Sequence, residues 1–237
     1  MFFFNRHTTI ADSGMLQGYT DWHSHLLPGV DDGAQTMDET LQILESYEWL
    51  GIRRVWLTPH IMEDMPNRTA DLRERFRELR SVYRGSVILN LAAENMLDNL
   101  FEERLEKGDL LPLGKYGEYL LVETSYFNPP IGLTNIMLRI KAKGYTPVLA
   151  HPERYAYMNI EDYHRLKAMG VKFQINLPSI AGMYGPPVKK KAEWMLKNNL
   201  CDMTGSDTHS LKIWETTIVR SVAKKSLNSV QCSAFSV

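Results

Sequence analysis

The chain has 237 residues, 44% of them hydrophobic and 23% charged. This composition is typical of a soluble globular protein, and barrel folds of this length often form one domain. Its formal net charge of −1 gives no overall attraction to nucleic acid or to an anionic membrane, so we expect neither as a partner. Two cysteines, Cys201 and Cys232, are too few for a disulfide framework, and we expect a cytoplasmic protein.

Residues 1–17 are predicted to form a loose N-terminal tail. The phenylalanines at positions 2–4 are followed directly by Asn5 and Arg6, without the longer apolar core and the cleavage site of a signal peptide. No stretch approaches the ~18 apolar residues of a membrane-spanning helix. The rest of the chain, residues 18–237, is predicted to be a single domain because no flexible linker divides it.

Short apolar runs alternate with longer amphipathic runs through this domain. The predicted strands are Tyr19–His23, Arg54–Pro59, Val87–Ala93, Tyr119–Glu123, Thr146–Ala150, Val171–Asn176 and Cys201–Gly205. The predicted helices are Met37–Leu50, Thr69–Tyr83, Leu100–Lys107, Leu133–Lys143, Ile160–Met169 and Pro187–Asn198. Strands alternating with helices indicate an α/β fold with a parallel sheet, and a sheet of this length closes most readily into a barrel.

Side chains that can bind metals gather at the ends of the predicted strands. In a barrel of alternating strands and helices, the carboxyl ends of the strands meet on one face, where active sites lie. Five of the seven histidines occupy such positions, together with two glutamates and an aspartate: His23, His25, His60, His151, His209, Glu94, Glu123 and Asp207. Eight such groups from different strands indicate a shared metal site.

The segment His23-Ser24-His25 is the strongest single motif. Alternation along a strand places both imidazoles on one side, where they can bind the same ion. The turn that follows contains Asp31 and Asp32; for Asp32, a metal ligand and an ordinary Asp-Gly turn are equally good interpretations. Nine candidate ligands suit two or three ions, and mixed nitrogen and oxygen ligation favours Mn, Fe or Zn without choosing among them.

Other catalytic classes lack their motifs. A cysteine phosphatase needs C-x5-R, but Asp207 stands six positions after Cys201. A nucleotide-binding loop of the G-x-x-x-x-G-K-[ST] type and a serine-hydrolase elbow of the G-x-S-x-G type are both missing from the sequence.

With these motifs, residues 18–211 resemble the polymerase-and-histidinol-phosphatase (PHP) superfamily. The segments that carry the likeness are DWHSHLLPGVDDGA, LTPH, LAHPERY and GSDTHS, with Glu94 and Glu123 at strand ends. Within the superfamily, the chain is most similar to the bacterial metal-dependent protein-tyrosine phosphatases of capsule and exopolysaccharide loci. The resemblance implies a distorted (β/α)7 TIM-like barrel, the PHP fold, with two or three divalent ions, manganese first and Fe or Zn as alternatives.

The resemblance also implies a role for each ligand. His23, His25, Glu94 and Asp207 would surround a first ion; Glu94, Glu123 and His151 a second; and Asp32, His60 and His209 a third. Arg154, after His151-Pro152-Glu153, would be the catalytic residue that contacts the phosphoryl group. Relatives often carry a second arginine where Trp214 stands here, so Lys212 is the candidate replacement, without a guanidinium fork.

The implied activity is hydrolysis of phosphotyrosine on a protein, with the C-terminal tail of a bacterial tyrosine kinase as the expected partner. The alternative is a small-molecule phosphatase resembling histidinol phosphatase, and the sequence assigns no general acid.

A basic helix face is formed by Arg73, Arg77, Arg80 and Arg84. We interpret it first as solvated surface and second as an attraction for an acidic phosphorylated tail. Three tryptophans are predicted to lie in or near the core: Trp49, Trp56 and Trp194.

Overall fold

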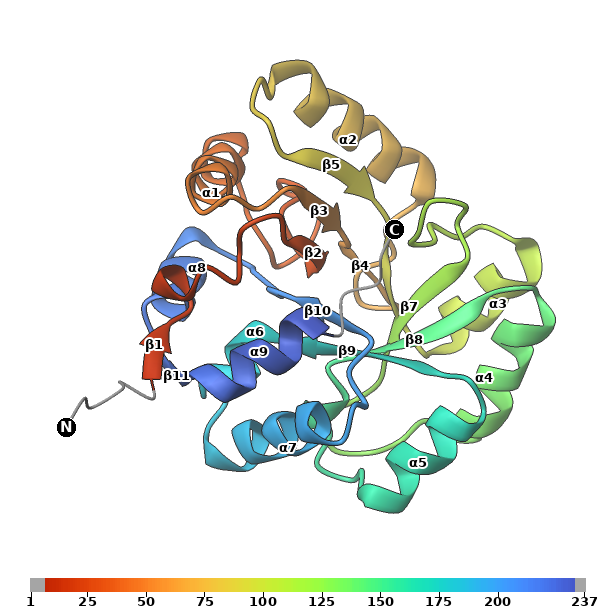
Figure 1. Ribbon diagram of the computed structural model, residues 1–237. Helices are drawn as coiled ribbons and strands as arrows, with labels where there is room; N and C mark the ends of the chain where they lie inside the picture. Colours follow the sequence, from red (N-terminus) through yellow and green to blue (C-terminus); the bar gives the residue numbers. More distant parts are fainter. Residues whose placement is uncertain (1–6, 233–237) are drawn as a thin grey trace.

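Parallel strands form the centre of the molecule in the computed structural model, which describes residues 7–232 (Figure 1). One sheet has six strands in the order β10 (Met203–Gly205), β9 (Lys172–Asn176), β8 (Thr146–Ala150), β7 (Tyr119–Glu123), β6 (Glu94–Met96) and β4 (His60–Ile61). A second sheet has three, β2 (Thr20–Ser24), β3 (Arg54–Leu57) and β5 (Ile88–Leu91), in that order. All of these strands pair in parallel, as the alternating pattern predicts.

The two sheets are parts of one curled arrangement. β3 passes through Thr58 and Pro59 into β4, and β5 passes through a pair of alanines into β6, so a short strand that was not predicted follows each of these two predicted strands. On the other side, β2 lies next to the end of β10, because the Asp207 N–H donates to the His23 carbonyl (2.8 Å) and the His25 N–H donates to the Thr208 carbonyl (3.0 Å). The fold is therefore α/β with a curled parallel sheet.

Helices surround the strands (Figure 1). They are α1 (Met37–Trp49), α2 (Thr69–Val82), α3 (Asn99–Lys107), α4 (Leu133–Ala142), α5 (Ile160–Ala168), α6 (Leu177–Ile180), α7 (Pro186–Lys197), α8 (Leu211–Ile218) and α9 (Lys224–Cys232). The six predicted helices are confirmed to within a residue or two at each end. The helices α6, α8 and α9 were not predicted.

The buried side chains form two hydrophobic clusters. A small one is centred on Trp22 and Trp56, whose rings stack with centroids 6.0 Å apart, and it includes Leu121 and Val148 from neighbouring strands. A larger one contains most of the apolar side chains that the helices bury. Trp56 is buried as predicted, but the core position predicted for Trp49 is wrong: at the end of α1 its side chain is 80% exposed.

The described part of the N-terminal segment is packed rather than loose. Residues His7–Thr9 form β1, which pairs antiparallel with β11 (Ser221–Ala223). Ile10 and Leu16 are buried because their apolar side chains join the large cluster. The loose tail is thus wrong for residues 7–17, and the phenylalanines at positions 2–4 lie outside the described residues. Between residues 7 and 232 no helix combines the length and the apolar character needed to cross a membrane.

Candidate metal centre

Most predicted ligands lie at or just after the carboxyl ends of β2, β7, β8 and β10, and two lie just past the breaks that follow β3 and β5. His23 lies in β2 and His25 just after it; His60 begins β4; Glu94 begins β6; Glu123 ends β7; His151 follows β8; and Asp207 and His209 follow β10. Seven of these side chains are buried, whereas His209 is partly exposed and Asp32 is 61% exposed. Strand topology thus brings together all nine side chains that the sequence singled out.

One group of ligand atoms lies between β2, β6 and β10. The Nε2 atoms of His23 and His25 are 3.1 Å apart. His23 Nε2 lies 3.1 Å and His25 Nε2 lies 3.3 Å from Oε2 of Glu94. The Oδ1 atom of Asp207 is 3.6 Å and 3.4 Å from the same two nitrogens. These four residues are the set that the resemblance assigns to a first ion.

Glu94 also faces a second group. Its Oε1 lies 3.0 Å from Nε2 of His151, and its Oε2 lies 3.2 Å from Nδ1 of His60. Glu123 reaches the same two rings, with Oε1 3.0 Å from His60 Nδ1 and Oε2 3.8 Å from His151 Nε2. His60 therefore lies with the ligands predicted for the second ion as well as with those predicted for the third.

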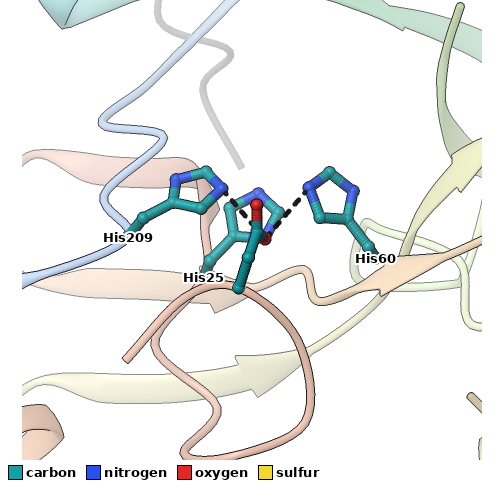
Figure 2. A group of neighbouring side chains, drawn as sticks. His25, His60 and His209 are labelled. Carbon is teal, nitrogen blue, oxygen red and sulfur yellow. Dashed lines mark ion pairs between the residues drawn. The ribbon is translucent and has the colours of Figure 1, made fainter. Parts of the chain in front are cut away.

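The third group is more open. Asp32 Oδ1 lies 3.6 Å from Nε2 of His60 and 3.5 Å from Nε2 of His209. Figure 2 shows the rings of His25, His60 and His209 gathered together, and the rings of His25 and His209 stack with centroids 3.9 Å apart. These four side chains meet the spacing needed to hold one cation.

Buried atoms without hydrogen bonds test whether metal ions fit here. Three buried atoms have no hydrogen-bond partner among the described residues: His60 Nδ1, Glu94 Oε2 and Glu123 Oε1. The two carboxylate oxygens nevertheless lie only 3.2 Å and 3.0 Å from His60 Nδ1. Two ligands each about 2.1 Å from one ion would lie about 3.0 Å apart at a right angle. A shared cation would satisfy all three atoms, so the donor set fits divalent metals.

The charges of the cluster point the same way. Burial by itself would raise the pKa of the Glu94 carboxyl, but the neighbouring His23 and His60 hold that pKa well below its usual range. Burial lowers the pKa of His23, whereas Glu94 and Asp207 raise it, with a net result of about 9. Buried ionised carboxylates therefore need positive charge beside them, which bound divalent cations supply.

Side chains behind the cluster orient the histidine rings. His23 Nδ1 lies 2.7 Å from Oε1 of Gln174, and His25 Nδ1 lies 2.8 Å from Oδ2 of Asp31. Because each Nδ1–H donates outward, each Nε2 lone pair is left for a metal. The sequence places Asp31 in the turn but does not indicate this role. Gln174 was not predicted, because only the pairing of β9 with its neighbours places it beside His23.

Arg154 lies at the edge of the cluster. Its Nη1 donates to Oδ2 of Asp207 (2.9 Å), and its guanidinium is sandwiched between the rings of Tyr126 and Tyr184, each 4.3 Å from Cζ. Burial lowers the pKa of Arg154, but Asp207 and Tyr184 raise that pKa by more, so the net shift is upward and the side chain stays charged. Its neighbour Glu153 points elsewhere and accepts the Asn176 N–H. The two tyrosines were missed because neither lies in a recognisable motif.

Two of the candidate ligands have strained backbones. His151 (φ 33°) and Asp207 (φ 49°) have backbones in the left-handed region, which residues other than glycine rarely adopt. At His151 this conformation starts the 3-10 turn Pro152–Arg154, which carries the arginine back toward Asp207. Such strain is typical of functional sites, where the surrounding structure holds it.

Position 214 belongs to the core rather than to the site. Trp214 is completely buried, its ring lies 4.6 Å from that of Tyr47, and its Nε1 donates to the Ser46 hydroxyl. Lys212 lies exposed in the first turn of α8. The role of Lys212 as a replacement for a second arginine stays a prediction.

Comparison with known proteins agrees with this geometry. The sequence model of the family described as "Capsular polysaccharide synthesis, CpsB/CapC" matches residues 19–228. The chain is 32% identical over 209 residues to the tyrosine-protein phosphatase CpsB of Streptococcus pneumoniae, which covers 81% of this chain and 83% of that protein. It is 29% identical over 198 residues to the tyrosine-protein phosphatase YwqE of Bacillus subtilis, covering 81% and 78% of the two chains.

A solved structure gives the same result. A chain from the crystal structures of YwqE from Bacillus subtilis and CpsB from Streptococcus pneumoniae, described as unique metal-dependent tyrosine phosphatases, superposes with a TM-score of 0.75 at 26% identity. The superposition covers 92% of this chain and 88% of that one. The protein therefore belongs to the CpsB/CapC family of capsular polysaccharide synthesis.

Proposed function

We propose that this protein is a metal-dependent phosphatase that hydrolyses phosphotyrosine on proteins. The observation that carries the proposal is the convergence of nine residues with nitrogen or oxygen ligand atoms, Glu94 among them, with the Arg154 guanidinium at the edge of the cluster. Family membership and the names of the relatives support the same activity.

The proposed cofactor is two or three divalent ions, most simply manganese, held by His23, His25, Asp32, His60, Glu94, Glu123, His151, Asp207 and His209. The four overlapping ligand groups support more than one ion, because Glu94 and His60 each belong to two groups. Bound ions would lower the pKa of water to supply a nucleophile and would neutralise phosphate oxygens. The mixture of imidazole and carboxylate ligands suits Mn, Fe or Zn.

Arg154 is proposed to bind the phosphoryl group of the substrate. Tyr126 and Tyr184 hold the guanidinium plane between them, so little side-chain entropy is lost when it donates to a phosphate oxygen. Asp207 already accepts from Nη1, which sets the direction in which the other N–H groups point. Phenolate is a good leaving group (pKa ~10), which lessens the need for a general acid beside these ligands.

We further propose that the curled sheet closes into a distorted seven-stranded barrel. The two hydrogen bonds between β2 and the end of β10 and the bridge between Ser24 and Thr208 support closure on that side. The proposed partner is the C-terminal tail of a bacterial tyrosine kinase in the cytoplasm.

Substrate profiling tests the proposal. The metal-loaded protein is assayed with phosphotyrosine peptides and with histidinol phosphate, and kcat/KM is compared. We expect the peptides to be hydrolysed much more efficiently, because the metal centre opens to solvent at Asp32, His209 and Arg154. Preference for histidinol phosphate would establish the small-molecule alternative, and no hydrolysis of either compound would contradict a phosphatase.

A further inference from the structure

A second concave site lies away from the metal centre, between α2, the strands β3 and β5, and the loop 111–117. We call it the basic groove; it has a volume of about 710 Å³. Figure 1 shows α2 lying along β5 at the rim of the molecule. None of the nine candidate metal ligands lines the groove, and Arg54 at its far end is separated from His60 by roughly 20 Å of extended chain. The groove is thus a different site from the metal centre.

Positive charge dominates the walls of the groove. Arg73, Arg77 and Arg80 share one face of α2 because they are spaced by three or four residues, and Arg54 and Lys115 line the other walls. No ion pair joins the three α2 arginines to an acidic side chain within residues 7–232. Glu118 lies beside the groove at Gly114, where its carboxylate accepts the Tyr116 N–H (2.9 Å). The excess charge is left to attract an anion.

The floor of the groove offers apolar contacts and an unused donor. Phe76, Leu89 and Leu91 are only half-buried where they line it. Trp56 also lines it and is 6% exposed, yet its indole Nε1 has no hydrogen-bond partner among the described residues. A buried N–H without an acceptor is costly, so this donor favours a ligand that brings a carbonyl or carboxylate oxygen.

One wall of the groove is a free strand edge. β5 pairs with β3 along one edge only, within the described residues. The Ile88 and Ala92 N–H groups donate to the carbonyls of Arg53 and Leu57, on the β3 side. The main-chain groups of Leu89 and Leu91 therefore point to the other edge, as does the Ala93 N–H that donates to Leu111. A free edge of this kind is where an extended peptide can add as a further strand.

We propose that the basic groove binds an acidic segment of another polypeptide, in extended conformation along the free edge of β5. The arginines of α2 and Lys115 would contact its carboxylates or phosphates, and Leu89 and Leu91 would pair with its main chain. An extended peptide also explains the apolar floor, because alternate side chains of a strand point toward it. The proposal concerns binding alone and does not depend on catalysis.

Fluorescence anisotropy with a labelled peptide of alternating glutamate and threonine tests the proposal. The peptide carries no phosphate, and inorganic phosphate is added so that the metal centre does not contribute. We expect saturable binding that weakens as salt is raised. The double variant Arg73→Gln/Arg77→Gln should bind at least about tenfold more weakly, since two charge-assisted contacts are lost. The same peptide with alternate amides N-methylated should also bind weakly, since strand pairing is blocked.

A matched double variant, Arg84→Gln/Arg220→Gln, removes the same charge from exposed positions outside the groove and should bind as tightly as wild type. Equal loss in this control would mean that overall charge drives binding, and would overturn the proposal. So would absence of binding to wild type at low salt. A single-stranded oligonucleotide of equal charge that binds wild type as tightly as the peptide would show a general polyanion site and would also overturn it.

Discussion

At the scale of single residues, the metal centre depends on the direction in which each ring nitrogen points. Gln174 and Asp31 each hold the Nδ1 atom of one histidine, so that the Nε2 atoms of His23 and His25 face Glu94. Such outer partners set both the tautomer and the position of a ligand before any ion binds.

Replacing Gln174 tests this orientation. In Gln174→Ala, His23 loses its acceptor and its ring is freed to rotate, so metal affinity should fall by about 10- to 100-fold. Isothermal titration of Mn²⁺ into the metal-free protein measures the change. The matched control is Gln17→Ala, which removes an exposed side chain that donates to the Leu50 carbonyl. Its affinity for Mn²⁺ should equal that of wild type. Unchanged affinity in Gln174→Ala would remove Gln174 from the metal centre.

Arg154 tests the phosphate contact. In Arg154→Lys the charge is kept, but the planar fork and its packing between two tyrosines are lost. We expect kcat/KM for a phosphotyrosine peptide to fall at least about tenfold. The free energy of unfolding, measured with urea, should change little. Arg165→Lys, at an exposed arginine paired with Asp162, should leave both unchanged. Hydrolysis by Arg154→Lys within a few-fold of wild type would exclude Arg154 from phosphate binding.

Eight of the nine candidate ligands were predictable because they lie at or just after the end of a short apolar run, and such runs can be recognised in the sequence. Asp31 and Asp32 show the limit of this approach. The sequence offers both carboxylates in one turn, but only the folded turn buries Asp31 behind His25 and leaves Asp32 exposed beside His209. Tyr126 and Tyr184 come from separate loops, and nothing local in either loop marks a partner of Arg154.

At the scale of elements, the two divided strands shape the metal centre. Thr58 and Pro59 break the line between β3 and β4, and the alanines at 92 and 93 do the same between β5 and β6. These breaks place His60 opposite Glu94 in the register of β4 and β6. The predicted strands Arg54–Pro59 and Val87–Ala93 end at these breaks, so the short strands β4 and β6 that follow them were not predicted.

Other elements differ in how well the sequence specifies them. β7 and β8 match their predicted bounds because each is a compact apolar run between polar or glycine residues. β1 and β11 were not predicted, because a three-residue pair is defined by its partner and not by its own pattern. Trp49 was misplaced because an apolar side chain at the end of an amphipathic helix carries no signal of exposure.

Trp214 tests whether α8 packs as a core element. Trp214→Ala removes a completely buried ring that packs on Tyr47 and donates to Ser46, so the free energy of unfolding should fall by about 3–5 kcal/mol. Denaturant titration measures it. Trp49→Ala, on an exposed side chain, should change it by less than about 0.5 kcal/mol. If turnover per folded molecule collapsed in Trp214→Ala while stability held, position 214 would belong to the site instead.

At the scale of the whole molecule, the curled parallel sheet is what makes the metal centre possible. Ligands that lie far apart in sequence, from His23 to His209, meet because every strand points its carboxyl end to one side. The basic groove is lined by other residues of β3 and β5, among them Arg54 and Leu89. The alternating pattern predicted this arrangement of strands, but the groove needed the fold, since α2, β5 and the loop 111–117 meet only in three dimensions.

The most direct test is to titrate Mn²⁺ into chelator-treated protein while measuring bound metal and hydrolysis of a phosphotyrosine peptide together. We predict that turnover is negligible without metal and rises as two or three ions bind per chain. Glu94→Gln replaces the carboxylate shared by two ligand groups with a neutral amide. This variant should bind less metal and lose turnover by orders of magnitude. Less than one bound equivalent in wild type, or undiminished turnover in the metal-free protein, would contradict a catalytic metal centre at Glu94.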